Sequence, residues 1–176
     1  TFLGLVTICA KRAVRKMGRK RYNLASRIDQ WMVERALTWL ATNDEARARV
    51  AYWTINLSGQ SLGDKSLLAA ITGAIKRWDL EPRLLMFEIT ETAAVANLVE
   101  ARTFIAELRG LGCRFALDDF GSGLSSFAYL KNLNIDCLKI DGMFVRDALA
   151  DPVDQAIVRS SNEVGHLLGL TTVAEF

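Results

Sequence analysis

The sequence has few of the residues that build disulfide frameworks or zinc sites. Its 176 residues include three cysteines, at positions 9, 113 and 137, and a single histidine, His166. The cysteines form no C-x-x-C pair, and a metal site built on imidazole needs companions. We therefore expect neither a structural zinc site nor a disulfide framework, and a reducing, cytoplasmic compartment suits the chain best.

Acidic residues are missing from the first 28 positions, which hold eight Lys or Arg residues. The remaining positions carry 14 basic and 20 acidic residues, so the body of the chain has a net charge of −6 although the whole chain has +2. Hydrophobic residues make up 51% and charged residues 24% of the sequence, which is typical of a globular domain and argues against disorder.

The first 21 residues join an apolar run, TFLGLVTICA, to a basic run, KRAVRKMGRKR. Ten apolar residues are too few to span a bilayer, and a signal peptide has its charges before the apolar run. The segment is consistent with the end of a membrane helix and its positive flank, with a basic patch for phosphate or lipid headgroups, or with sequence outside the fold. We favour the last interpretation and expect residues 1–20 to lie outside a single domain formed by residues 21–176.

Hydrophobic patterning predicts strands that alternate with helices. Strands are expected at residues 51–58, 84–90, 115–117, 135–141 and 171–175, and helices at residues 26–40, 67–78, 95–111, 127–133 and after Pro152. The first of these helices is expected to have Ser26 as its N-cap, with Asp29 three residues later in an imperfect capping box. Strict alternation indicates a parallel sheet with right-handed crossovers. The expected fold class is α/β, a partial TIM-like (β/α) barrel with parallel strands and about five of eight βα units.

Polar side chains interrupt the apolar runs at the ends of all five predicted strands. They are Asn56, Glu88, Asp118, Lys139 and Glu175. A charged or amide group at such a position destabilises a core unless it lines a site. In a (β/α) barrel the carboxyl ends of the strands meet at one mouth, where catalytic groups collect.

The stretch RFALDDFGSGLSS, residues 114–126, places two carboxylates side by side at the end of a short apolar strand. The charges of Asp118 and Asp119 repel each other unless a cation or a proton lies between them. An ordinary strand-to-helix turn is the alternative, because Asp, Gly and Ser are the common residues of turns.

The oxygen ligands among these residues suit a hard divalent cation, Mg²⁺ or Mn²⁺, better than zinc. The candidate ligands are Asn56, Glu88, Asp118 and Asp119. Several carboxylates at one mouth can hold two such ions, which activate water and stabilise the leaving oxygen in phosphodiester hydrolysis. Lys139 would then neutralise charge on the phosphate or orient the attacking water, and Glu175 would complete the ligand set or take a proton.

A phosphoacceptor receiver domain also combines paired aspartates at one strand end with a lysine at another. In that arrangement the acid pair ends the first strand, a further Asp ends the third and the lysine ends the fifth. Here two predicted strands precede the pair, and Lys139 follows on the very next strand. The order of the strands therefore disfavours the receiver interpretation.

Five motifs carry a resemblance to a known family. They are INLSG (55–59), FEITET (87–92), LDDFGSGLSS (117–126), LKID (138–141) and TVAE (172–175). In order and spacing they resemble the EAL domain family over residues 21–175. Members of that family are bacterial phosphodiesterases that open cyclic di-GMP to the linear dinucleotide pGpG on a TIM-like barrel, and the resemblance implies the same fold and activity here.

The resemblance also implies roles for individual residues. The metal ligands would be Asn56, Glu88, Asp118 and, for a second ion, Asp119, while Lys139 and Glu175 would complete the catalytic centre. Glu91 resembles the residue that steadies the DDFG loop, which in the family couples metal, substrate and dimerisation. The implied partners are cyclic di-GMP, a second copy of the chain through the DDFG loop region, and an upstream sensor or cyclase domain. A full-length protein anchored to the inner membrane is compatible with this, and no DNA or RNA polymer is implied.

Three departures from the family pattern bear on activity. The Glu-Ala-Leu stretch, whose glutamate is a metal ligand, has no match in residues 1–20. The sequence ends at Glu175-Phe176, before the family's further strands and their substrate-binding glutamine, and Leu124 replaces a common tyrosine. We therefore expect a barrel truncated at both ends with impaired hydrolysis; the alternative is a catalytically inactive EAL-like module that binds cyclic di-GMP or a protein partner.

Overall fold

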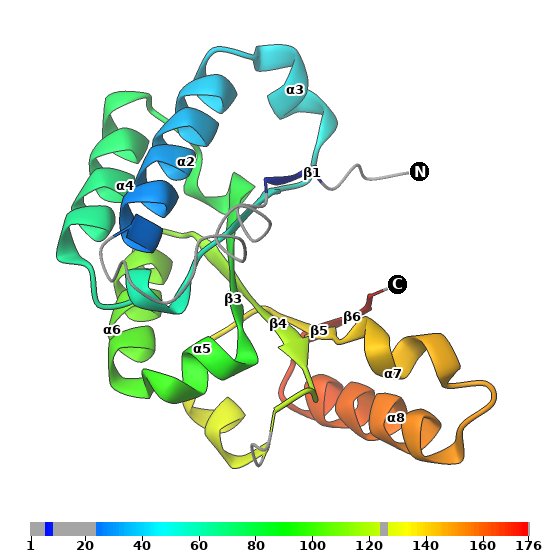
Figure 1. Ribbon diagram of the computed structural model, residues 1–176. Helices are drawn as coiled ribbons and strands as arrows, with labels where there is room; N and C mark the ends of the chain where they lie inside the picture. The colour runs from blue at the N-terminus through cyan, green and yellow to red at the C-terminus, as the bar shows by residue number, and fades with distance from the viewer. Residues whose placement is uncertain (1–5, 9–23, 124–126, 176) are drawn as a thin grey trace.

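The computed structural model describes residues 6–8, 24–123 and 127–175. In these residues six strands form one parallel sheet, and their order in space follows their order in the chain (Figure 1). The strands are β1 (Val6–Ile8), β2 (Trp53–Asn56), β3 (Leu85–Thr90), β4 (Arg114–Phe120), β5 (Cys137–Ile140) and β6 (Thr171–Ala174). Because each strand pairs in parallel with the next one in the chain, all crossovers run in the same sense, as in a TIM-like barrel.

Helices connect successive strands. They are α2 (Leu24–Ala41), α3 (Asp44–Arg49), α4 (Lys65–Arg77), α5 (Glu91–Ala96), α6 (Leu98–Gly110), α7 (Gly142–Asp147) and α8 (Pro152–Leu167), with 3-10 turns η1 (Gly59–Ser61), η2 (Pro82–Leu84) and η3 (Phe127–Asn132). In Figure 1, α2, α4 and α6 lie along one side of the sheet, whereas α7 and α8 pack together beside β5 and β6. None of the described helices is both long and apolar enough to cross a membrane.

The two faces of the sheet differ because successive side chains of a strand point to opposite faces. One face is apolar and forms the main core with the helices; it includes Ile55, Phe87, Phe115, Leu117 and Leu138. The other face carries a small apolar layer made of Met86, Ala116 and Cys137. Two positions further along each of these three strands the side chain is charged, so this second face becomes polar toward the carboxyl ends.

The five predicted strands are confirmed, whereas two details of the predicted helices are wrong. The helix expected over residues 95–111 is divided at Asn97, whose side-chain amide donates to the Ala93 carbonyl at 3.1 Å and ends α5. Ser26 does not cap the first long helix, because α2 begins at Leu24 and the Ser26 hydroxyl donates to Asp64 instead.

Residues 1–20, which the sequence analysis places outside the fold, include β1. Its residues Val6–Ile8 pair in parallel with positions 53–55 of β2, so these three residues belong to the sheet. The other residues of this segment and Leu124 lie outside the described residues.

Candidate functional site

Five predicted site residues lie at the carboxyl ends of β2 to β6. Asn56 ends β2, Glu88, Asp118 and Lys139 lie near the ends of β3, β4 and β5, and Glu175 directly follows β6. The strand register places them near one another. Asn56 is the register partner of Glu88, and Lys139 is the register partner of Val173, two residues before Glu175. Parallel pairing therefore brings an amide, three carboxylates and an ammonium to one rim of the sheet.

Lys139 joins the acidic residues of this rim. Its Nζ atom lies 2.9 Å from Asp118 Oδ1, 3.3 Å from Glu88 Oε2 and 2.5 Å from Glu175 Oε1. Burial lowers the pKa of Lys139, but its hydrogen bonds to Glu175 and Asp118 and the charges of Glu88 and Asp118 together raise it by more, so the net pKa lies above the usual value. The ammonium therefore stays charged at neutral pH and offsets part of the negative charge of the three carboxylates.

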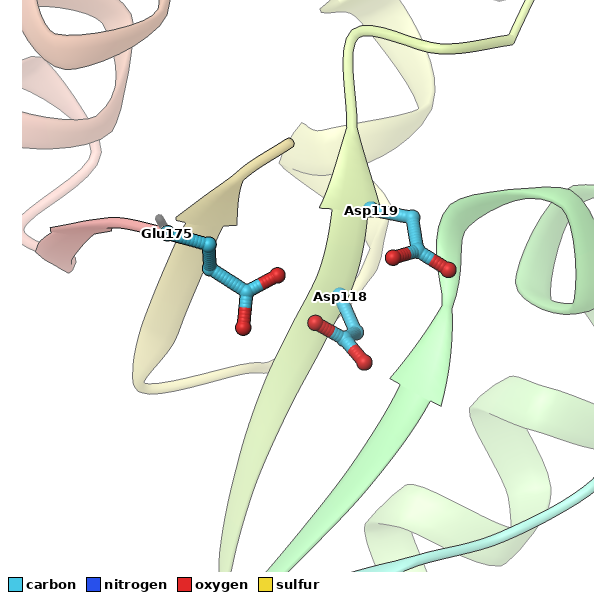
Figure 2. A group of neighbouring side chains, drawn as sticks. All are labelled: Asp118, Asp119 and Glu175. Atoms are coloured by element: carbon cyan, nitrogen blue, oxygen red, sulfur yellow. The ribbon is translucent and has the colours of Figure 1, made fainter. Parts of the chain in front are cut away.

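A β-bulge brings Asp119 to the same rim as Asp118. Neighbours in a regular strand point to opposite faces, but the register of β4 with β5 shifts between Leu117 and Phe120, and Asp119 has a φ of 55°. As a result, one oxygen of each of Asp118, Asp119 and Glu175 lies within 4.8 Å of the others. Figure 2 shows these three side chains, with the Glu175 carboxylate extending from the end of β6 toward Asp118.

The cluster of Asp118, Asp119 and Glu175 has the chemistry of a site for a hard cation. Burial raises the pKa of Glu175, and the charge of Asp118 raises it further, while Lys139 opposes both effects. A nearby positive charge reduces the repulsion between carboxylates that lie this close together. All of their donor atoms are oxygens, the ligands that Mg²⁺ and Mn²⁺ prefer, so the residues present fit such an ion.

Glu91, the first residue of α5, contacts the loop that follows Asp119. Its side chain is 1% exposed; Oε2 accepts the N–H groups of Gly121 at 3.0 Å and Gly123 at 3.3 Å, and Oε1 accepts the Tyr129 hydroxyl at 2.8 Å. Gly121 has a φ of 97°, which favours glycine. Tyr129 could not be predicted as part of the site, because the sequence gives no signal that its partner lies 38 residues earlier.

A second buried carboxylate, Asp29 of α2, holds the chain just beyond Asn56. Its Oδ2 atom accepts the Ser58 N–H at 2.7 Å and the Ser61 hydroxyl at 2.5 Å, and the side chain is only 2% exposed. The sequence suggested a capping role for Asp29, which is wrong. Its place on the apolar face of the predicted helix could have indicated its role, because a buried acid requires hydrogen-bond partners.

A sequential parallel sheet with an amide, acids and a lysine at the carboxyl ends of its strands defines a TIM-barrel-like domain with its candidate site at the barrel mouth. Comparison with known families gives the same class. The chain belongs to the EAL domain family, whose sequence model matches residues 18–176.

Curated relatives share this region. The chain is 40% identical over 157 residues to cyclic di-GMP phosphodiesterase PdeB of Shewanella oneidensis, and the match covers 89% of the chain and 18% of PdeB. It is 36% identical over 155 residues to cyclic di-GMP phosphodiesterase PdeF of Escherichia coli K12, covering 88% of the chain and 21% of PdeF. The chain thus spans about a fifth of the length of these relatives.

Solved structures of the family have the same fold. The PaMucR phosphodiesterase in complex with c-di-GMP matches with a TM-score of 0.78 and 31% identity, over 86% of this chain and 62% of that one. The FimX EAL domain from Pseudomonas aeruginosa, bound to c-di-GMP, matches with a TM-score of 0.79 and 30% identity, over 94% and 63% of the two chains.

Proposed function

We propose that this domain catalyses metal-dependent hydrolysis of cyclic di-GMP to linear pGpG. The observation that carries the proposal is the contact of Lys139 with three carboxylates, those of Glu88 in β3, Asp118 in β4 and Glu175 just after β6. The two curated relatives named above are cyclic di-GMP phosphodiesterases, and two of the matching structures hold c-di-GMP, which supports the same substrate here.

The rim residues provide the groups that phosphodiester hydrolysis needs. We assign Asn56, Glu88, Asp118 and Asp119 as the ligands of Mg²⁺ or Mn²⁺. When bound, the ion supplies a polarised water and stabilises negative charge on the phosphate. The protonated Lys139 adds positive charge beside the phosphate oxygens, where charge builds up as the water oxygen attacks phosphorus and the ester P–O bond breaks. Glu175, with its raised pKa, accepts a proton from the attacking water, and the leaving ribose oxygen takes a proton from solvent to become the free hydroxyl of linear pGpG.

One observation favours a second candidate, a module that binds cyclic di-GMP without turnover. Strand β1 pairs with β2, the strand that carries Asn56, and is therefore the neighbour from which a further ligand would come. Residues 1–28 contain no Asp or Glu, so β1 supplies no carboxylate to the rim. Loss of one anionic ligand lowers the affinity of a site for hard cations.

The proposal predicts that Glu88→Gln abolishes a Mg²⁺-dependent activity. The amide keeps the shape of Glu88 but removes its negative charge. Because Glu88 is 2% exposed and its carboxylate contacts Lys139, we expect turnover to fall by roughly 100-fold. The measurement is the rate of pGpG formation from cyclic di-GMP, with Mg²⁺ and with a chelator.

Glu107→Gln, on the exposed face of α6, is the matched control and should leave the rate unchanged. Turnover that persists in the presence of chelator, or in the Glu88→Gln variant, would contradict the proposal. Binding of cyclic di-GMP by the wild-type chain with no product at any metal concentration would instead support the binding module.

A further inference from the structure

One carboxylate, that of Glu91, is bound from both sides of the DDFG loop. The backbone N–H groups of Gly121 and Gly123 donate to its Oε2 atom, and the Tyr129 hydroxyl, in η3 beyond the loop, donates to its Oε1 atom. The donors to Oε2 therefore lie at the beginning of the loop, and the donor to Oε1 lies after the loop has ended. Their common acceptor belongs to α5, a different βα unit.

Burial makes these three donors important for Glu91. An ionised carboxylate that is 1% exposed is destabilised unless hydrogen bonds replace its water. Because the glycine amides share Oε2, Tyr129 fixes the other oxygen and thereby the rotation of the whole carboxylate. Burial and the contact with Glu91 raise the pKa of Tyr129, so its hydroxyl remains a proton donor at physiological pH.

The turn held by Glu91 also determines where Asp119 points. Gly121, whose N–H is bound by Glu91, lies two residues after Asp119, and the hydroxyl of Ser122 donates to the Asp119 carbonyl at 2.7 Å. The φ of 55° at Asp119 is unfavourable for a residue with a side chain and persists only where surrounding contacts enforce it. Weakening the hydrogen bond from the Gly121 N–H to Glu91 would therefore allow the Asp119 side chain to move away from Asp118 and Glu175.

We propose that Tyr129 is a positioning residue for Asp119, which it holds at the rim through Glu91 and the glycine amides. The effect of Tyr129 on metal binding by Asp119 rests on the function proposed above, whereas its effect on the hydrogen bonds of the loop does not. Tyr129 acts by completing the hydrogen bonds of Glu91.

The test is Tyr129→Phe, which removes one hydroxyl and keeps the ring. We expect the amide protons of Gly121 and Gly123 to exchange roughly tenfold faster with solvent, as measured by NMR, because loss of one hydrogen bond is worth about that factor. In the enzyme assay we expect the Mg²⁺ concentration for half-maximal rate to rise severalfold, with KM for cyclic di-GMP unchanged. Tyr52→Phe is the matched control, since the Tyr52 ring packs against Arg114 on a different part of the sheet.

The outcomes separate the two proposals. Unchanged exchange of both glycine amides in Tyr129→Phe overturns the positioning role, and so does unchanged Mg²⁺ dependence in an active enzyme. If the wild-type chain shows no turnover, the proposed hydrolysis fails, but amide exchange and Mn²⁺ affinity of the Tyr129→Phe variant still decide the role of Tyr129. Faster exchange with weaker Mn²⁺ binding supports it; faster exchange with unchanged Mn²⁺ binding overturns its link to Asp119.

Discussion

Replacing Lys139 by methionine is expected to destabilise the metal-free chain by about 3–5 kcal/mol, the usual effect of removing one partner from a buried ion pair. Lys139 is 8% exposed and contacts Glu88 and Asp118, which are each 2% exposed, and also Glu175. Without the ammonium these carboxylates repel one another in a poorly solvated place. The free energy of unfolding, measured in urea, should fall by this amount, whereas Lys131→Met at an exposed position of η3 should have little effect.

The same variant has a defined pH dependence. The pKa of Lys139 in the folded chain lies above its usual value of 10.5, so its stabilisation is complete below that pH and is lost as the pH rises through the folded value. The stability difference between wild type and Lys139→Met should therefore narrow above pH 10.5. It should also narrow in acid, where the carboxylates become protonated, and Mg²⁺ should restore part of the lost stability. A difference that is independent of both pH and Mg²⁺ would contradict this account of the rim.

Asp118→Asn is expected to lower the rate of cyclic di-GMP hydrolysis by roughly 100-fold, the upper end of the loss that follows when the partners of metal ligands are changed. Asp118 is buried, accepts a hydrogen bond from Lys139 at 2.9 Å, and is central to the cluster with Asp119 and Glu175. Asparagine has the same shape as aspartate but no negative charge, so a fall in the hydrolysis rate would measure the contribution of the Asp118 charge.

The control for this variant is Asp147→Asn, at the exposed end of α7, which should retain the wild-type rate. Mn²⁺ affinity, measured by calorimetry, should fall together with the rate in Asp118→Asn. A variant that keeps wild-type turnover, or that loses turnover with no change in Mn²⁺ affinity, would exclude Asp118 as a metal ligand.

The positions of the strand-end residues could be predicted because they depend on local pattern. Glu88 and Lys139 each interrupt a buried strand near its end, and sequential parallel pairing aligns those ends. The period of two along each strand then decides the face on which the side chain lies. No contact between distant residues had to be known for this part of the site.

Other features depend on contacts that the sequence does not display. Glu91, from another βα unit, accepts the Gly121 N–H just after the bulge at Asp119, and the side chains of Asp29 and Tyr129 have partners far away in the chain. Strand β1 was missed because its apolar run precedes a basic one, while its pairing with β2 is a tertiary contact. A homodimer through the DDFG loop region and an upstream sensor or cyclase domain stay predictions.

The central claim is that separate strands bring the carboxylates of this rim together to bind a divalent cation. The most direct measurement is anomalous diffraction from crystals of the chain grown with Mn²⁺ and cyclic di-GMP. We predict a manganese peak at direct coordination distance from Glu88 and Asp118, with the phosphate of the nucleotide beside Lys139. Nucleotide density at the rim with no manganese peak there, or manganese bound only elsewhere on the molecule, would contradict the claim.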